Sequence, residues 1–300
     1  MQHPSKPLAK TRQGTLAGSA EQGIHIWRGI PYAAPPVGPL RWRAPQPAAR
    51  WQGVRPAENF SAASWQDIDY CRELGGGDPG AFSEDCLYLN VWAPASAAQP
   101  LPVMVWLHGG GFTIGAGSLP PYDGKALASR DVVVVTVNYR LGHLGFFAHP
   151  ALEEEAGERL YNFALLDQIA ALQWVQENIH AFGGDAANVT LFGESAGARS
   201  VLSLMASPKA KGLFHKAIIQ SGYTLPDLPR EKCAGKRAPD WQEHFALPQA
   251  SAEELRAIPR RPLVAHRAAE YRASAYCRRR GAAAADAGDL LCRPPSIRYR

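Results

Sequence analysis

The sequence contains no apolar run long enough to cross a membrane. Its longest run, at residues 132–135 and their neighbours, is far shorter than the ~18 residues that a spanning helix requires. The first 14 residues hold Lys6, Lys10 and Arg12 but no apolar stretch of the length found in secretory signal peptides. We therefore expect a soluble, cytoplasmic protein with no membrane partner.

Charged residues and cysteines are also scarce. Only 20% of the residues are charged and eight tryptophans are spread along the chain, which argues against disorder throughout. The five cysteines have irregular spacings that match no zinc pattern, so no metal site is expected. A chain of 300 residues that is 46% hydrophobic can bury a substantial core without disulfides. These features exclude a short disulfide-stapled scaffold.

The positive charge lies at one end of the chain. Residues 223–300 contain 15 Lys and Arg against 9 Asp and Glu, whereas residues 1–222 contain 17 basic and 18 acidic residues. Residues 260–300 alone hold 10 Arg and 10 Ala, including the run at 278–280. The body is nearly neutral, so the net charge of +5 does not predict a nucleic-acid partner.

Apolar runs of strand length alternate with helical patterns after Asp85. The run at 132–135 is continuously apolar, as a parallel strand covered on both faces requires. Five apolar residues at helical spacing predict a helix with one buried stripe, ending near residues 182–184: Leu165, Ile169, Leu172, Val175 and Ile179. This alternation predicts an α/β fold, with further strands at 87–92, 102–107, 189–192 and 217–219.

The pentapeptide GESAG at residues 193–197 lies between a predicted strand and a predicted helix at 199–205. A G-x-S-x-G sequence in this context forms a turn so sharp that side chains at the glycine positions would clash. The turn exposes the hydroxyl of Ser195, and the positive end of the following helix dipole favours a developing anion there. The context therefore predicts a nucleophilic serine.

A second motif, HGGGF at residues 108–112, also follows a predicted strand. Consecutive glycines let bare backbone N–H groups approach a substrate oxygen closely, and each such donor is worth about 10² to 10³ in rate. A flexible turn or a phosphate-binding loop is the alternative, but neither Gly-Lys-Ser/Thr nor G-x-G-x-x-G spacing is present. We expect His108 to be a packing residue and not a general base.

With both motifs present, the chain resembles the type-B carboxylesterases, an α/β-hydrolase family that includes cholinesterases and bacterial p-nitrobenzyl esterases. Residues 13–223 are similar to the family, with Ala164 where glycine is more common. The resemblance implies an α/β-hydrolase fold with a mostly parallel central sheet and an incomplete C-terminal part. It is carried by further segments in family order: WRGIPY (27–32), PPVG (35–38), LRW (40–42), EDCLYLN (84–90), NYRLG (138–142), LDQ (166–168), FGGD (182–185) and QSG (220–222).

The resemblance implies a serine ester hydrolase that acts through an acyl-enzyme on small-molecule esters and needs no cofactor. Ser195 corresponds to the nucleophile, the N–H groups of Gly110, Gly111 and Ala196 to the oxyanion hole, and Glu194 to a residue lining the site. A non-catalytic binding protein on the same scaffold, like the adhesion members of the superfamily, is the alternative. The intact Ser195 and glycine loop disfavour it, and the oligomeric state stays open.

The resemblance also implies structural contacts. Arg41 with Glu84 and Arg140 with Asp167 correspond to buried ion pairs, and breaking one partner of such a pair costs about 3 to 5 kcal/mol. Cys86 stands where secreted members have a disulfide, and Cys71 is the only earlier cysteine. Without an export signal, we expect free thiols in preference to a Cys71–Cys86 bridge.

The acid and histidine that should follow the nucleophile are not identifiable. Five candidates occur, none in a recognisable family segment: His215, His244, Glu253, Glu254 and His266. We divide the chain into a hydrolase part at 1–222, the start of a lid region at 223–259 and a tail at 260–300. The tail is expected to be disordered or read out of frame, which would leave a truncated esterase. Whether that polypeptide is active stays open, because its triad acid and histidine are not identified.

Overall fold

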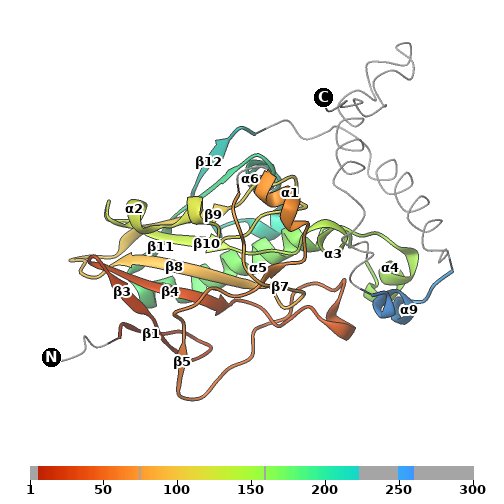
Figure 1. Cartoon of the computed structure of the whole chain (residues 1–300), viewed down its shortest axis with the longest axis horizontal. Helices are drawn as coiled ribbons and strands as arrows, with labels where there is room; N and C mark the ends of the chain where they lie inside the picture. Colours follow the sequence, from red (N-terminus) through yellow and green to blue (C-terminus); the bar gives the residue numbers. More distant parts are fainter. Residues whose placement is uncertain (1–5, 74–75, 159, 223–248, 260–300) are drawn as a thin grey trace, which may run out of the picture.

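One seven-stranded sheet organises the computed structural model of the chain, which describes residues 6–73, 76–158, 160–222 and 249–259 (Figure 1). Three of its six strand pairings are parallel and three are antiparallel, so within the described residues the sheet is mixed. The parallel half consists of the first four strands in spatial order. That order is β12 (Lys216–Gln220), β11 (Gly184–Glu194), β9 (Leu101–Leu107), β10 (Val133–Val137), β8 (Tyr88–Pro94), β4 (Ile24–Pro31) and β3 (Ser19–Glu21).

Shorter elements surround this sheet. Two small sheets are formed by β1 (Leu8–Lys10), β2 (Thr15–Ala17) and β5 (Val54–Pro56), and by β6 (Ala63–Ser64) and β7 (Phe82–Ser83). The helices are α1 (Ile68–Glu73), α2 (Lys125–Ala128), α3 (Gly142–Gly145), α4 (Pro150–Ala156), α5 (Phe163–Asn178), α6 (Ala196–Met205) and α9 (Ala252–Ala257).

The main core lies between the sheet and helices α5 and α6. Successive strand residues point to opposite faces, so Val133 and Val135 of β10 join the core beneath α5. Val134 points the other way and packs with Trp92 and with Ala128 of α2. All five residues of β10 are buried, which confirms the prediction of a strand covered on both faces.

Helix α5 is buried on more sides than a single apolar stripe predicts. Leu172 and Val175 join the main core as expected, but Leu165 is only half-buried. The polar residues Gln168 and Asn178 are fully buried. Gln168 donates to Ser200 of α6 at 3.1 Å, and Asn178 accepts the backbone N–H of Arg12 at 2.8 Å. These contacts place α5 between the sheet, α6 and the N-terminal segment.

Helix α9 returns to the body of the protein and packs beside α4 (Figure 1). Leu255 and Ile258 are buried in a second apolar cluster with Trp42, Phe147 and Phe163. The capping box of Ser251 and Glu254 begins the helix. The predictions for residues 223–248 and 260–300, which include the tail, His244 and His266, lie outside the described residues.

Candidate active site

Ser195 lies on a strained bend between β11 and α6. Its φ of 52° and ψ of −112° are conformations that a residue with a side chain seldom adopts. The Ser195 N–H donates to the carbonyl of Gln220 at the end of β12, and the Ser195 carbonyl accepts the N–H of Arg199, each at 3.0 Å. The adjoining strand and helix therefore hold the bend, and the Ser195 side chain stays half-buried.

The two glycines of the pentapeptide lie against backbone that a side chain would strike. A Cβ at Gly197 would come within 1.9 Å of the Leu107 carbonyl oxygen, and a Cβ at Gly193 within 2.6 Å of the Gly197 carbonyl carbon. The register of β11 and β9 pairs Gly193 with Leu107, so the bend sits directly on the end of β9. The steric prediction for these glycines is confirmed.

The glycine loop that follows β9 packs against the same bend. A Cβ at Gly109 would lie 3.4 Å from the Cβ of Ser195 and 2.6 Å from Oε2 of Glu194. The loop then turns through positive φ at Gly110 (99°) and Gly111 (62°). Because β9 and β11 are parallel neighbours, the loops after them meet at one edge of the sheet, which brings the two sequence motifs together.

Within the described residues, three backbone amides at this edge have no hydrogen-bond acceptor. No residue that the structure describes accepts a hydrogen bond from the N–H of Gly110, Gly111 or Ala196. The carbonyl of Gly110, in contrast, is hydrogen-bonded, since it accepts the N–H groups of Thr113 at 3.0 Å and Ile114 at 3.1 Å. Gly110 is half-buried and Gly111 exposed, so both can meet a ligand. Ala196 is the first residue of the ten-residue helix α6, which adds the positive end of its dipole.

His108 is a buried packing residue, as expected. Its ring stacks on Tyr139 with centroids 4.3 Å apart, and its Nδ1 lies 2.9 Å from the Gly109 carbonyl. Burial lowers the pKa of His108 to about 4, so the ring is neutral near pH 7. The Tyr139 hydroxyl donates to the His108 carbonyl at 2.6 Å. The pair supports the start of the glycine loop and offers no base to Ser195.

Sequence reasoning missed another support of the glycine loop. The N–H of Gly142, at the start of α3, donates to the carbonyl of Phe112 at 2.7 Å. The Phe112 ring packs edge-on against Phe146, with centroids 5.0 Å apart. The family-like segment at 138–142 marked this region, but its contact with the loop is a property of the folded chain.

Glu194 is half-buried beside the bend, in van der Waals range of Gly109. Its charge adds to the effect of burial in raising the pKa of Tyr122. A carboxylate therefore lies next to the nucleophile candidate, on the residue preceding it.

The described candidates for the missing acid and histidine have other roles. His215 accepts the N–H of Val189 through Nδ1 at 3.2 Å, between β11 and β12. Glu254 caps α9, and hydrogen bonds from Ser251 lower the pKa of its carboxyl. Figure 1 shows α9, which also carries Glu253, beside α4 and away from α6. Within the described residues, Ser195 therefore has no identified base.

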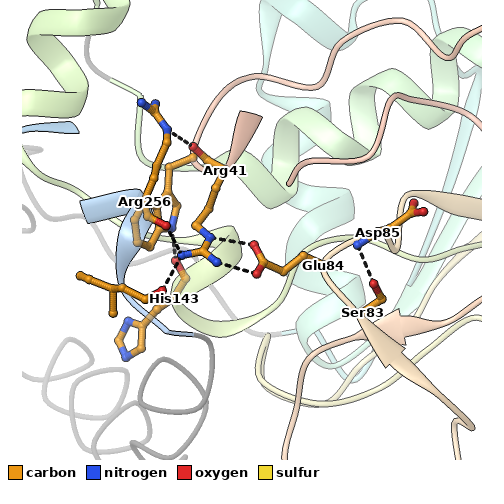
Figure 2. Close-up of polar contacts among 8 residues, drawn as sticks. Arg41, Ser83, Glu84, Asp85, His143 and Arg256 are labelled. Atoms are coloured by element: carbon orange, nitrogen blue, oxygen red, sulfur yellow. Dashed lines mark hydrogen bonds and ion pairs between the residues drawn. The ribbon is translucent and has the colours of Figure 1, made fainter. Parts of the chain in front are cut away.

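The expected buried ion pairs are both present. Arg41 donates to the two oxygens of Glu84 at 2.7 and 2.6 Å, and Arg140 to those of Asp167 at 2.8 and 2.6 Å. The sequence did not predict that Nη1 of Arg41 also donates to the carbonyls of Arg256 and Ile258, at 2.8 and 2.7 Å (Figure 2). In turn, Nε of Arg256 donates a hydrogen bond to the Arg41 carbonyl at 2.8 Å. No local pattern signals contacts between residues 215 positions apart.

Other sequence expectations concern cysteines, metals and membranes. Cys71 and Cys86 are free and buried in different apolar clusters, which agrees with the expectation of free thiols. The described residues hold no group of three or more side chains suited to a metal ion. Nor does any helix among them have the length and apolarity to cross a bilayer.

Comparisons with known proteins all point to the same family. The sequence profile of the carboxylesterase family matches residues 5–278. The para-nitrobenzyl esterase of Bacillus subtilis is 50% identical over 232 residues, which are 77% of this chain and 46% of the relative. The fumonisin B1 esterase of Sphingopyxis macrogoltabida is 49% identical over 256 residues, 84% of this chain and 47% of the relative. The chain thus spans about half the length of the curated relatives it matches.

Solved structures give the same result. A PNB esterase is similar with a TM-score of 0.80 and 44% identity, covering 87% of this chain and 53% of its own. A Geobacillus stearothermophilus carboxylesterase is similar with a TM-score of 0.77 and 42% identity. The match covers 86% of this chain and 52% of that carboxylesterase. This similarity confirms the α/β-hydrolase fold. The relatives named here are esterases, and none of them supports the non-catalytic alternative.

Proposed function

The chain belongs to the carboxylesterase family, and from that premise we propose that the protein hydrolyses small-molecule carboxylic esters through an acyl-enzyme on Ser195. One observation carries the proposal: the strained bend at Ser195 packs against Gly109, beside three backbone amides that donate to no described residue. A nucleophile and a set of oxyanion donors at the same edge of a sheet are two of the requirements of acyl transfer.

In the proposed reaction, the Oγ of Ser195 forms a bond to the ester carbonyl carbon while a general base accepts the hydroxyl proton. The N–H groups of Gly110, Gly111 and Ala196 stabilise the negative charge on the carbonyl oxygen. The bond to the alcohol then breaks, the proton passes to the leaving alcohol, and water hydrolyses the acyl-enzyme by the same steps. A histidine and an acid outside the described residues complete this scheme.

Two further assignments belong to the proposal. Glu194 lines the site beside the nucleophile, where its carboxylate influences charge on the bound substrate or alcohol. The protein works in the cytoplasm, because the free, buried thiols of Cys71 and Cys86 suit a reducing compartment.

A covalent probe tests the role of Ser195. We expect a fluorophosphonate to label the protein on Ser195, because only an activated serine displaces fluoride. Ser195→Ala should lose the label. It should also hydrolyse p-nitrophenyl acetate about 10⁴- to 10⁶-fold more slowly than the wild type.

Ser203→Ala is the matched control, since Ser203 lies half-buried on α6 and its hydroxyl donates to the Arg199 carbonyl at 2.9 Å. It should retain both label and activity. Equal labelling and equal hydrolysis by the wild type and Ser195→Ala would refute the proposal.

A further inference from the structure

The glycine loop folds back on itself through a return segment, residues 113–117. Gly115 in this segment lies against the start of the loop: a Cβ there would overlap Nδ1 of His108 and lie 2.9 Å from the Gly109 carbonyl oxygen. Its φ of 113° is a conformation that favours glycine. Because Gly115 touches the residues at which the loop begins, a contact that fixes Gly115 also fixes the loop.

Gln66 provides such a contact from 49 positions earlier in the chain. It follows β6 and is 5% accessible. Its Oε1 accepts the Gly115 N–H at 2.7 Å, and its Nε2 donates to the Gly115 carbonyl at 2.8 Å and to the Ser64 carbonyl at 3.0 Å. One side-chain amide therefore binds both the N–H and the carbonyl of Gly115. The backbone of Gly115 cannot rotate without breaking these bonds.

Apolar packing also reaches the return segment, but it has no direction. Ile114 and Ala116, which flank Gly115, are buried in one cluster with Ala63 of β6. Apolar burial brings the segment close to β6 without setting the orientation of its peptide groups. Hydrogen bonds do set this orientation, because they weaken steeply as their angle departs from linearity. The orientation of the Gly115 backbone therefore depends on Gln66.

The position of Gly115 influences where the Gly110 N–H points. This N–H shares a planar, trans peptide unit with the Gly109 carbonyl, so the two groups point in opposite directions. The Gly109 carbonyl oxygen lies 2.9 Å from Nδ1 of His108 and also packs against Gly115. Holding Gly115 in place therefore restrains this carbonyl and, with it, the N–H of the same peptide unit.

The return segment orients the Gly111 N–H in the same way. This N–H shares its peptide unit with the Gly110 carbonyl. That carbonyl accepts the N–H groups of Thr113 and Ile114 at 3.0 and 3.1 Å, and the Thr113 hydroxyl at 3.2 Å. Ile114 directly precedes the residue that Gln66 binds, so a shift of the return segment would turn the Gly111 N–H.

We propose that Gln66 is a positioning residue of the oxyanion hole, which orients the N–H groups of Gly110 and Gly111 by holding Gly115. The inference rests on the proposed function, in which these amides stabilise the negative charge on the carbonyl oxygen. Gln66 acts through the loop and not on the substrate. Oxyanion donors contribute mainly in the transition state, so Gln66 should affect kcat more than KM.

Gln66→Met tests the hold on the loop, because methionine is similarly long and unbranched but lacks the amide. We expect amide hydrogen exchange at residues 113–115 to become at least about tenfold faster, since the Gly115 N–H loses its acceptor and the loop loosens. This measurement requires no catalytic activity, so its result does not depend on the proposed function.

Kinetics test the effect on the oxyanion hole. With p-nitrophenyl acetate, kcat of Gln66→Met should fall at least about tenfold while KM stays within about threefold of the wild type. Rates are expressed per site labelled by a fluorophosphonate, so that a smaller folded fraction does not imitate the effect. Gln66→Glu keeps an acceptor for the Gly115 N–H but places a carboxylate against two carbonyls, and it should lose at least as much kcat.

Gln176→Met is the matched control. Gln176 is half-buried on α5, and its Nε2 donates to the carbonyls of Ala186 and Leu213 at 2.9 and 3.0 Å. Ala186 lies near the start of β11, at the other end of that strand from Ser195. The control therefore loses the same kind of hydrogen bonds away from the glycine loop, and it should keep wild-type loop exchange and kcat per labelled site.

The outcomes separate this proposal from the proposed function. Unchanged loop exchange in Gln66→Met, or wild-type kcat per labelled site despite faster exchange, would overturn the positioning role. Equal effects of Gln66→Met and Gln176→Met would also overturn it, since they would indicate a general loss of stability. A wild type that takes no label, together with faster loop exchange in Gln66→Met, would refute the proposed function and support the hold of Gln66 on the glycine loop.

Discussion

At Gly197 the backbone of the bend leaves no room for a methyl group. The nearest atom to an added Cβ is the Leu107 carbonyl oxygen at 1.9 Å, and this oxygen belongs to a central strand that cannot move alone. Gly212 is different, because its φ of 79° disfavours a side chain but no atom lies within 4 Å. Gly197 therefore needs glycine because of a steric clash, whereas Gly212 favours glycine only because of its backbone conformation.

We therefore expect Gly197→Ala to lower the free energy of unfolding by at least about 3 kcal/mol, from overpacking against fixed backbone. Gly212→Ala should cost only the left-handed penalty of about 1 to 2 kcal/mol. Urea denaturation followed by circular dichroism measures both. Similar losses for the two variants would contradict the steric explanation.

At the scale of elements, α9 depends on contacts from a distant loop. The guanidinium of Arg41 donates hydrogen bonds both to the two oxygens of Glu84 and to the carbonyls of Arg256 and Ile258 (Figure 2). Arg256 also contacts Glu155 of α4, at 2.9 Å from Nη1. A lysine can replace the charge of Arg41 but not this geometry.

We expect Arg41→Lys to loosen α9 specifically. Amide hydrogen exchange at residues 252–257 should become at least about tenfold faster, because the hydrogen bonds from the charged Arg41 to the carbonyls of Arg256 and Ile258 are lost. Arg43→Lys is the control, since Arg43 is 46% accessible and its pair with Glu155 contributes little. Unchanged exchange in α9 of Arg41→Lys would show that apolar packing alone holds the helix.

At the scale of the whole molecule, acid acts on the fold through a buried neutral histidine. The pKa of His108 is about 4 in the folded protein, against 6.5 for an ordinary histidine. Between these values the unfolded chain binds a proton that the folded protein does not, so stability falls as pH falls. Carboxyls with lowered pKa values, such as those of Glu21 and Glu155, add to the loss only below about pH 4.5.

We expect the free energy of unfolding to fall by about 2 kcal/mol more between pH 7 and pH 5 in the wild type than in His108→Gln. The glutamine variant does not titrate in this window, and the carboxyls stay ionised throughout it. Urea denaturation at the two pH values measures the difference. Parallel losses in both proteins would contradict a neutral, buried His108.

Sequence reasoning identified the strands of the parallel half and the two motifs at their ends. Local rules suffice for these features, because a continuous apolar strand and a G-x-S-x-G bend each depend on neighbouring residues. It described α5 incompletely, since Gln168 and Asn178 are buried by partners far away in the sequence. It also overlooked Gly142 and Gln220, whose contributions are backbone bonds that any residue type can make.

The sequence by itself determined the strand at 133–137, the bend at Ser195, the glycine loop and the buried ion pairs. The first three follow from local sterics and periodicity, and the ion pairs follow from resemblance to a family. Only the tertiary structure decided that Gly109 meets Ser195, that Arg41 contacts α9 and that Ile218 and Ile219 of β12 are exposed. These depend on which strands become neighbours, and that choice is made by packing between distant segments.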